Sequence, residues 1–335
     1  MLQLKNGTPF KASLMLLPDV DGIDTVYAVV KGTFTLGSRL TLADEQVPVV
    51  LADQHHADPA GSSIKVASDV CLGKQHTDVV LLGSACAPAE RPVWHMDVSL
   101  AVGSVRKAVR VFGDRVWDAR TGVATIAHLT PFVRMPLTWE RAYGGMDETE
   151  QGPAGHPRNP VGTGFRARGG TKPIAGTPVP NVEDPAALIT SPADAPAPAG
   201  FAAVAPHWEP RRSYAGTYDD AWQAERAPYL PKDFDPRFFQ LAPPGLVAAG
   251  HLQGDETVEL RGLTPNGLLH FALPLLGIRV VYRLDASTQE RAGVLDTVVV
   301  EPDTGRLVMV WRAALRCDKK ALAVREVHTN ILQAA

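Results

Sequence analysis

Short hydrophobic runs, divided by frequent glycine and proline, dominate the pattern of this chain. In residues 25–36 the apolar positions recur with a period of two, which predicts a strand with one buried face. Residues 78–83 instead contain the unbroken run Val-Val-Leu-Leu, which is typical of a short strand buried on both faces. Strands of these two kinds indicate a β-rich fold.

Turn signals between such runs predict three β-hairpins. The first joins residues 96–102 to 105–112 through Gly103-Ser104, and glycine at the first of two loop positions suits a type II′ turn. The second joins 258–263 to 268–273 through Thr-Pro-Asn-Gly, and the third joins 295–301 to 306–313 through Pro-Asp-Thr-Gly. Hairpins of this kind favour antiparallel sheets.

Helix signals are few and short. Asp220 with Gln223 resembles a capping box that opens a helix over 221–227, which Pro228 ends. Asp235 before Pro236 predicts a single further turn. We therefore expect a mainly β fold of antiparallel sheets, arranged as a sandwich or barrel, with long irregular Gly/Pro-rich loops and few short helices.

The character of the chain changes in residues 144–216, which are rich in glycine, proline and alanine. So long an irregular segment usually serves a function or links domains. It also contains Phe165, Phe201, Trp208 and Tyr214, which a flexible linker would not need, so we expect an ordered layer over the sheets. This predicts an N-terminal β region, 1–135, and a loop-covered C-terminal β region, 136–335, or one continuous unit.

Composition narrows the classes of function. The formal net charge of -3 over 335 residues gives no electrostatic basis for binding nucleic acid. Three scattered cysteines without a C-x-x-C pair argue against a disulfide framework and a thiolate zinc site. Residues 1–10 lack the apolar core of a secretory signal, and no apolar run approaches the roughly 20 residues that span a bilayer. We expect a cytoplasmic protein without a membrane partner.

The search for reaction chemistry finds no complete catalytic or phosphate-binding motif. An acidic run, Asp147, Glu148 and Glu150, could supply paired carboxylates, but a solvated charge run is the simpler interpretation. A metal site would draw on residues whose spacing is not diagnostic: His55, His56, Asp58, Asp69, His76 and Asp78. We expect no metal, no cofactor and no catalytic turnover.

Aromatic and arginine residues are concentrated in the middle of the chain. These residue types dominate binding hot spots, because each buries a large area while offering a polar group. The alternative is that they pin the irregular segments to the sheets. Nine candidate partner-binding residues follow: Trp139, Arg141, Tyr143, Arg158, Trp208, Arg211, Tyr214, Tyr218 and Trp222.

Several loop motifs in this order resemble one bacterial family. They include Trp-Glu-Arg-Ala-Tyr-Gly-Gly at 139–145, Arg-Asn-Pro-Val-Gly-Thr-Gly-Phe at 158–165, Trp-Glu-Pro-Arg at 208–211 and Ala-Gly-Thr-Tyr-Asp-Asp-Ala-Trp at 215–222. Val-Lys-Gly-Thr-Phe at 30–34 and Val-Trp-Arg-Ala at 310–313 extend the resemblance over nearly the whole chain. The chain is similar to the domain-of-unknown-function family encoded beside type VI secretion effectors.

The resemblance implies an adaptor or chaperone that loads an effector onto the secretion spike. Its expected partners are the effector protein encoded nearby and the spike protein, and the family supplies no catalytic residues. Two alternatives remain: a hydrolase or carbohydrate-active enzyme using the acidic run or the His/Asp group, and a β module that binds a small ligand. An enzyme should gather titratable groups in one cleft, an adaptor should expose aromatic or apolar anchors, and a ligand-binding module should have one apolar pocket with convergent polar groups.

Overall fold

The computed structural model describes residues 2–318 and 321–332. The fold is mainly β, with antiparallel sheets, long irregular connections and few short helices, which confirms the predicted class. None of the helices in these two ranges has the length and apolar character needed to span a membrane.

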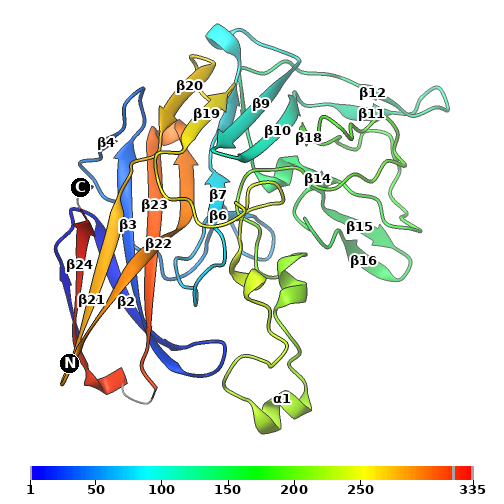
Figure 1. Cartoon of the computed structure of the whole chain (residues 1–335). Helices are drawn as coiled ribbons and strands as arrows, with labels where there is room; N and C mark the ends of the chain where they lie inside the picture. Colours follow the sequence, from blue (N-terminus) through cyan, green and yellow to red (C-terminus); the bar gives the residue numbers. More distant parts are fainter. Residues whose placement is uncertain (1, 319–320, 333–335) are drawn as a thin grey trace.

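The larger of two main sheets curls into a nearly closed barrel (Figure 1). Its two end strands are joined by the short connection 7–10, and the pairs are antiparallel except β1 with β24 and β7 with β22. The strands in spatial order are β1 (Gln3–Asn6), β24 (Val324–Leu332), β21 (Gly277–Leu284), β22 (Thr288–Glu301), β23 (Arg306–Arg316), β3 (Asp24–Thr35) and β2 (Lys11–Pro18), with β4 (Thr41–Leu42) beside β3 and β7 (Asp78–Leu81) beside β22.

A second sheet of five strands packs on the same hydrophobic core. Its order is β18 (Val182–Glu183), β10 (Val105–Phe112), β9 (His95–Val102), β19 (Thr257–Arg261) and β20 (Leu268–Ala272). Both main sheets therefore take strands from each side of residue 135. The predicted regions 1–135 and 136–335 are interleaved within the sheets.

The remaining elements are short. Two-stranded pairs are formed by β5 (Gln54–His55) with β6 (Ile64–Val66), β8 (Ser84–Cys86) with β13 (Arg134–Pro136), β11 (Val116–Asp118) with β12 (Thr125–Ala127), β14 (Tyr143–Gly144) with β17 (Thr163–Gly164), and β15 (Met146–Thr149) with β16 (Gly152–Gly155). The helices are α1 (Asp220–Glu225) and the 3-10 turns η1 (Pro88–Glu90), η2 (Trp139–Arg141), η3 (Arg211–Tyr214), η4 (Pro236–Phe239), η5 (Pro302–Thr304) and η6 (Ala321–Ala323).

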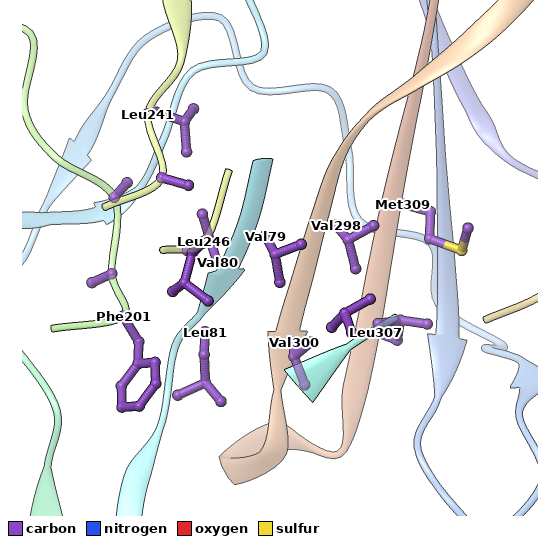
Figure 2. Packing of buried hydrophobic residues seen from close by; sticks show 14 of the residues in the cluster. Val79, Val80, Leu81, Phe201, Leu241, Leu246, Val298, Val300, Leu307 and Met309 are labelled. Atoms are coloured by element: carbon purple, nitrogen blue, oxygen red, sulfur yellow. The ribbon is translucent and has the colours of Figure 1, made fainter. Parts of the chain in front are cut away.

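Strand β7 is a short strand that is fully buried, as its unbroken apolar sequence predicted. All four of its residues are buried, and the strand pairs in parallel with β22. Figure 2 shows Val79 on the side of Val298, with Phe201 and Leu246 on the other side of β7. The irregular segment that contains Phe201 therefore does more than cover the sheets. Its apolar side chains pack inside the core, on the side of β7 away from Val298.

The prediction for residues 25–36 was right about the strand and wrong about its faces. Strand β3 is buried on both sides. Val26, Val30 and the residues in phase with them face the main core, whereas Tyr27 and Val29 join a second cluster with Met15, Val308 and Val310. Val47, Val49 and Leu72, from an irregular loop distant in sequence, pack on that second cluster. Local alternation cannot reveal such a cover.

All three predicted hairpins form. Val102 pairs with Val105 in β9–β10, Arg261 pairs with Leu268 in β19–β20, and β22–β23 closes at Glu301 and Arg306. Gly103 has a φ of 56°, which the first position of a type II′ turn requires. These turns could be predicted because their geometry depends on the residues within them.

The helix predicted over 221–227 corresponds to α1, but its cap lies one residue earlier than expected. Asp219, not Asp220, accepts a hydrogen bond of 2.8 Å from the backbone N of Trp222. The turn predicted after Asp235 is η4, and Asp235 caps it through the N–H of Arg237 at 2.9 Å.

Candidate binding site

The segment between the two strand-rich parts of the chain forms a protruding arm, residues 210–240. Its two limbs carry η3 and η4, and α1 lies at its tip (Figure 1). In the figure, α1 stands apart from both main sheets at the far end of this loop. The arm therefore projects from the body of the fold.

Arginine side chains hold the two limbs of the arm together at its base. Arg211 donates from Nε to the carbonyl of Phe238 at 2.8 Å and from Nη1 to the carbonyl of Val204 at 2.6 Å. Arg237 lies over the ring of Tyr214 at 4.4 Å from the centroid, an attractive cation–π geometry. Each guanidinium thus bridges residues distant along the chain and limits relative motion of the limbs.

Aromatic residues gather at the tip of the arm. The rings of Tyr218 and Trp222 meet edge to face at 4.7 Å, and Nε1 of Trp222 donates to the carbonyl of Tyr229 at 2.8 Å. Tyr218 is 53% exposed and Tyr229 is 41% exposed, while Trp222 is half-buried. We call Tyr218, Trp222 and Tyr229 the aromatic tip.

The tip also contacts the body of the protein. Nη2 of Arg226 donates to the carbonyl of Val20 at 2.8 Å, in the turn between β2 and β3, and Nε donates to the carbonyl of Leu230. Gly22 of the same turn lies against the ring of Tyr229, where a Cβ would come within 3.2 Å. These contacts hold the tip against the β2–β3 turn. Its exposed rings are therefore ordered before a partner binds.

A groove lies beside the base of the arm. It consists of two adjoining cavities of about 310 and 730 Å³, which share Lys65, Val66, Leu82, Glu301 and Arg306 in their walls. The smaller cavity is also lined by η4, by loop residues between 47 and 71, and by apolar side chains of β22 and β23. The larger cavity extends to residues 136–141 and to the turn after β22.

Buried ion pairs lie beside the smaller cavity, among them Lys74–Asp78 and Arg312–Asp296. Lys74 Nζ is 2.7 Å from both Asp78 Oδ2 and Thr297 Oγ1, and Arg312 Nε is 2.7 Å from Asp296 Oδ2. Burial opposes the charge on Asp296, but Arg312 and Lys74 outweigh that effect and hold its pKa below the usual range. Burial likewise opposes the charge on Lys74, but Asp78 and Asp296 outweigh it and raise the pKa of that ammonium.

The comparison with known families now adds to this geometry. A family model described as "uncharacterized protein conserved in bacteria" (DUF2169) matches residues 21–312. The chain belongs to this family. Similar comparisons with curated proteins and with solved structures found no match. The matched range contains the arm and all groove-lining residues, so both are parts of the DUF2169 region itself.

Three of the nine candidate partner-binding residues are core residues of the DUF2169 fold. Trp139, Tyr143 and Trp208 are 3%, 4% and 1% exposed. Trp139 and Trp208 pack edge to face at 6.2 Å, and Nε1 of Trp139 donates to the carbonyl of Ala203 at 2.9 Å. Their rings have almost no surface to offer a partner in the folded chain, so we correct their assignment: they pin the irregular segments to the sheets.

The loop motifs around these residues are locked to one another. Nδ2 of Asn159 donates to the carbonyls of Trp139 at 2.8 Å and Tyr143 at 3.0 Å. Gly145 donates from its N–H to the carbonyl of Asn159 at 2.8 Å. The motifs at 139–145 and 158–165 therefore have a structural role in the DUF2169 fold.

Four of the other six candidates lie on the arm. Arg211 and Tyr214 lie at the base, and Tyr218 and Trp222 lie at the tip. Arg158 is exposed and lines a small hollow with Glu209 and Pro210 beside the base. Arg141 lines the larger cavity of the groove, and its Nη1 donates to Asn181 Oδ1 at 3.1 Å. Tyr229 and the groove were missed, because only the folded chain brings their neighbours together.

The acidic run is divided between burial and solvent. Asp147 is 2% exposed, and its carboxylate accepts hydrogen bonds from the N–H groups of Glu148 at 2.9 Å and Ala167 at 3.0 Å. Glu148 and Glu150 are exposed. The interpretation as a solvated run is therefore wrong for Asp147, which holds two loop segments together.

The six candidate metal ligands have separate environments. Asp78 pairs with Lys74, and Asp69 pairs with Lys31 at 2.8 Å. His55, His56 and Asp58 lie around the β5–β6 turn, and His76 precedes β7. Within residues 2–318 and 321–332, no three His, Cys, Asp or Glu side chains are grouped closely enough to hold a metal ion.

Proposed function

We propose that this DUF2169 protein is a cytoplasmic adaptor or chaperone that binds a type VI secretion effector and helps to load it onto the secretion spike. The observation that carries the proposal is the exposed aromatic tip, held on a braced arm. The order of the loop motifs supports it as well, because it resembles that of the family encoded beside type VI secretion effectors.

The aromatic tip has two properties that favour binding, exposed apolar area and groups that can form hydrogen bonds. Exposed tyrosine rings leave apolar area in contact with water. A partner that covers this area would remove it from water, which favours binding. Tyrosine adds a hydroxyl for hydrogen bonding and loses little rotamer freedom on binding. Because the tip is braced by Arg226 and Trp222, a partner need not pay to order it.

A binding role also agrees with the condition of the buried charges. Lys74, Asp78, Asp296 and Arg312 are each neutralised by an opposite charge at 2.7 Å. Freeing one group of such a pair for reaction with a substrate would leave its partner buried and uncompensated. We therefore propose a function without catalytic turnover or a cofactor.

Co-expression with the effector encoded beside this gene tests the proposal. We expect the effector to co-purify with the chain, and its soluble level and secretion to fall when the gene is deleted. Complementation by the wild-type gene should restore both, whereas a Tyr218→Ser/Tyr229→Ser variant should not. An effector that is equally abundant, soluble and secreted without this protein would contradict the proposal.

A further inference from the structure

The groove has the size and lining of a binding site. Its two cavities, about 310 and 730 Å³, lie within the range of about 300–1,000 Å³ usual for ligand sites. Val80, Leu82, Val299 and Phe239 contribute apolar wall beside the arm. Displacing water from an apolar wall lowers the free energy of the complex. An occupant with apolar side chains is therefore favoured.

Most charges on the wall of the smaller cavity are already paired. Lys31 pairs with Asp69 at 2.8 Å, and Arg306 pairs with Glu301 at 2.7 Å. Lys74 and Arg312 have the buried partners described above. These groups can therefore offer little net charge to an occupant.

Two cations on this wall have no such partner. Within the described parts of the chain, neither Arg211 nor Lys65 has a carboxylate within 4.0 Å, and Nη2 of Arg211 donates no hydrogen bond. Burial lowers the pKa of Arg211, with Asp53 partly opposing that effect. Asp53 is the one carboxylate on this wall outside an ion pair among the described residues, and it accepts from the N–H of Ser68 at 2.7 Å. The wall thus retains an excess of positive charge.

We propose that the groove binds an extended apolar segment of the effector that carries an acidic side chain, with its carboxylate beside Arg211 and Lys65. The inference rests on the proposed adaptor function and names the part of the effector that is recognised. A carboxylate would complete the free side of the Arg211 guanidinium, whose fork geometry suits it. The larger cavity takes the neighbouring apolar side chains, and its Glu140 is held by Ser63 N–H at 2.7 Å.

The position of Arg211 connects the groove to the aromatic tip. Arg211 belongs to η3 at the base of the arm, and Phe238 and Phe239 of η4 line the same cavity. The arm therefore offers an effector two contacts, one at its aromatic tip and one at the groove beside its base. Two contacts on one rigid element raise the affinity of the whole because the second forms at a high effective concentration.

Overlapping synthetic peptides that cover the effector encoded beside this gene provide the probe, with fluorescence anisotropy as the readout on the full-length protein. We expect one acidic, apolar peptide to bind, and its Glu→Gln or Asp→Asn analogue to bind at least about tenfold more weakly. Lys65→Glu should weaken binding by a similar factor, because it places a negative charge beside the carboxylate of the peptide. Lys65 is exposed, so its replacement should not disturb folding. Lys11→Glu, an equally exposed lysine outside the groove, is the matched control.

Arg211→Gln should abolish most of the remaining dependence on the peptide's acid, and thermal unfolding of this variant shows whether the arm remains folded. If no peptide binds, or if a peptide binds equally to the wild type and to Lys65→Glu, the groove inference is overturned. Effector that still co-purifies with the wild-type chain in that case leaves the adaptor function standing. Failure of the wild-type chain to retain the effector overturns both.

Discussion

Asp296 shows how strongly single residues in this fold depend on one another. Its carboxylate is fully buried between Arg312 Nε at 2.7 Å and Thr297 Oγ1 at 2.8 Å. The Arg312 guanidinium in turn donates from Nη2 to the carbonyl of Asp69 at 2.7 Å, which connects β23 to the loop over β3. Burial opposes the charge on Arg312, but Asp296 outweighs it and raises the pKa of the guanidinium. The pair joins sheet and loop through charges that are almost fully buried.

We predict that Asp296→Asn lowers the free energy of unfolding by about 3–5 kcal/mol at pH 7, because it leaves Arg312 buried without a counter-charge. The folded pKa of Asp296 lies below its unfolded value of about 3.9. Its contribution is therefore present above that pH and is lost as the pH falls through the folded pKa. Urea unfolding should show the difference between wild type and variant shrinking below about pH 4.

Asp285→Asn is the control for that measurement. Asp285 pairs with Arg325 at 2.6 Å on the surface, with both side chains more than half exposed. Surface pairs of this kind contribute little because solvent screens them, so this variant should unfold like the wild type. Equal losses from Asp285→Asn and Asp296→Asn would refute the special role of the buried pair.

Residue types alone could not separate the binding candidates from the core. Tryptophan, tyrosine and arginine are enriched both in binding hot spots and among residues that anchor loops. Trp208 and Trp222 occur in neighbouring motifs, yet Trp208 is buried in the core and Trp222 lies at the arm tip. The difference depends on long-range contacts, such as those that bring the carbonyls of residues 202–203 beside Trp139 in the folded chain.

At the scale of elements, hairpins and caps followed local chemistry, whereas burial did not. The three hairpins were predictable because turn geometry is set by the residues of the turn. The cap of α1 was misplaced by one residue because Asp219 and Asp220 are adjacent and both suit an N-cap. The second buried face of β3 depends on a loop that its own sequence cannot specify.

The N-cap of α1, Asp219, can be tested by substitution. Asp219→Ala should loosen α1 by about 1 kcal/mol, because the N–H of Trp222 loses its acceptor. Hydrogen exchange should then be faster at the Trp222 amide. Asp220→Ala removes a charge of the same sign from the next residue and should leave that amide nearly unchanged. The reverse order of effects would show that Asp220 is the cap.

At the scale of the whole molecule, the fold class was predictable and the surface was not. The β pattern and turn spacing indicated a sheet protein, but the interleaving of strands across residue 135 depends on long-range pairings such as β19 with β9. The groove takes its wall from residues as distant in sequence as Lys65, Arg211 and Arg306. No local pattern joins these positions, so neither the groove nor its excess positive charge could be derived from the sequence.

The adaptor proposal requires an exposed surface that a partner can recognise. The arm projects from the folded body, and Tyr218 and Tyr229 near its tip are exposed. Other large exposed hydrophobic residues, such as Trp94 at 53% exposure, lie outside the arm. Trp94 therefore offers a control in which the same kind of exposed aromatic surface is removed elsewhere.

The affinity of the purified protein for the effector encoded beside its gene, measured by isothermal titration calorimetry, tests the central claim most directly. The wild-type chain should bind, and Tyr218→Ser/Tyr229→Ser should raise the Kd by at least about 30-fold, or about 2 kcal/mol. Trp94→Ser should leave the Kd unchanged, and circular dichroism should show both variants folded. A wild-type chain that does not bind the effector, or a tip variant that binds as tightly as the wild type, would contradict the account.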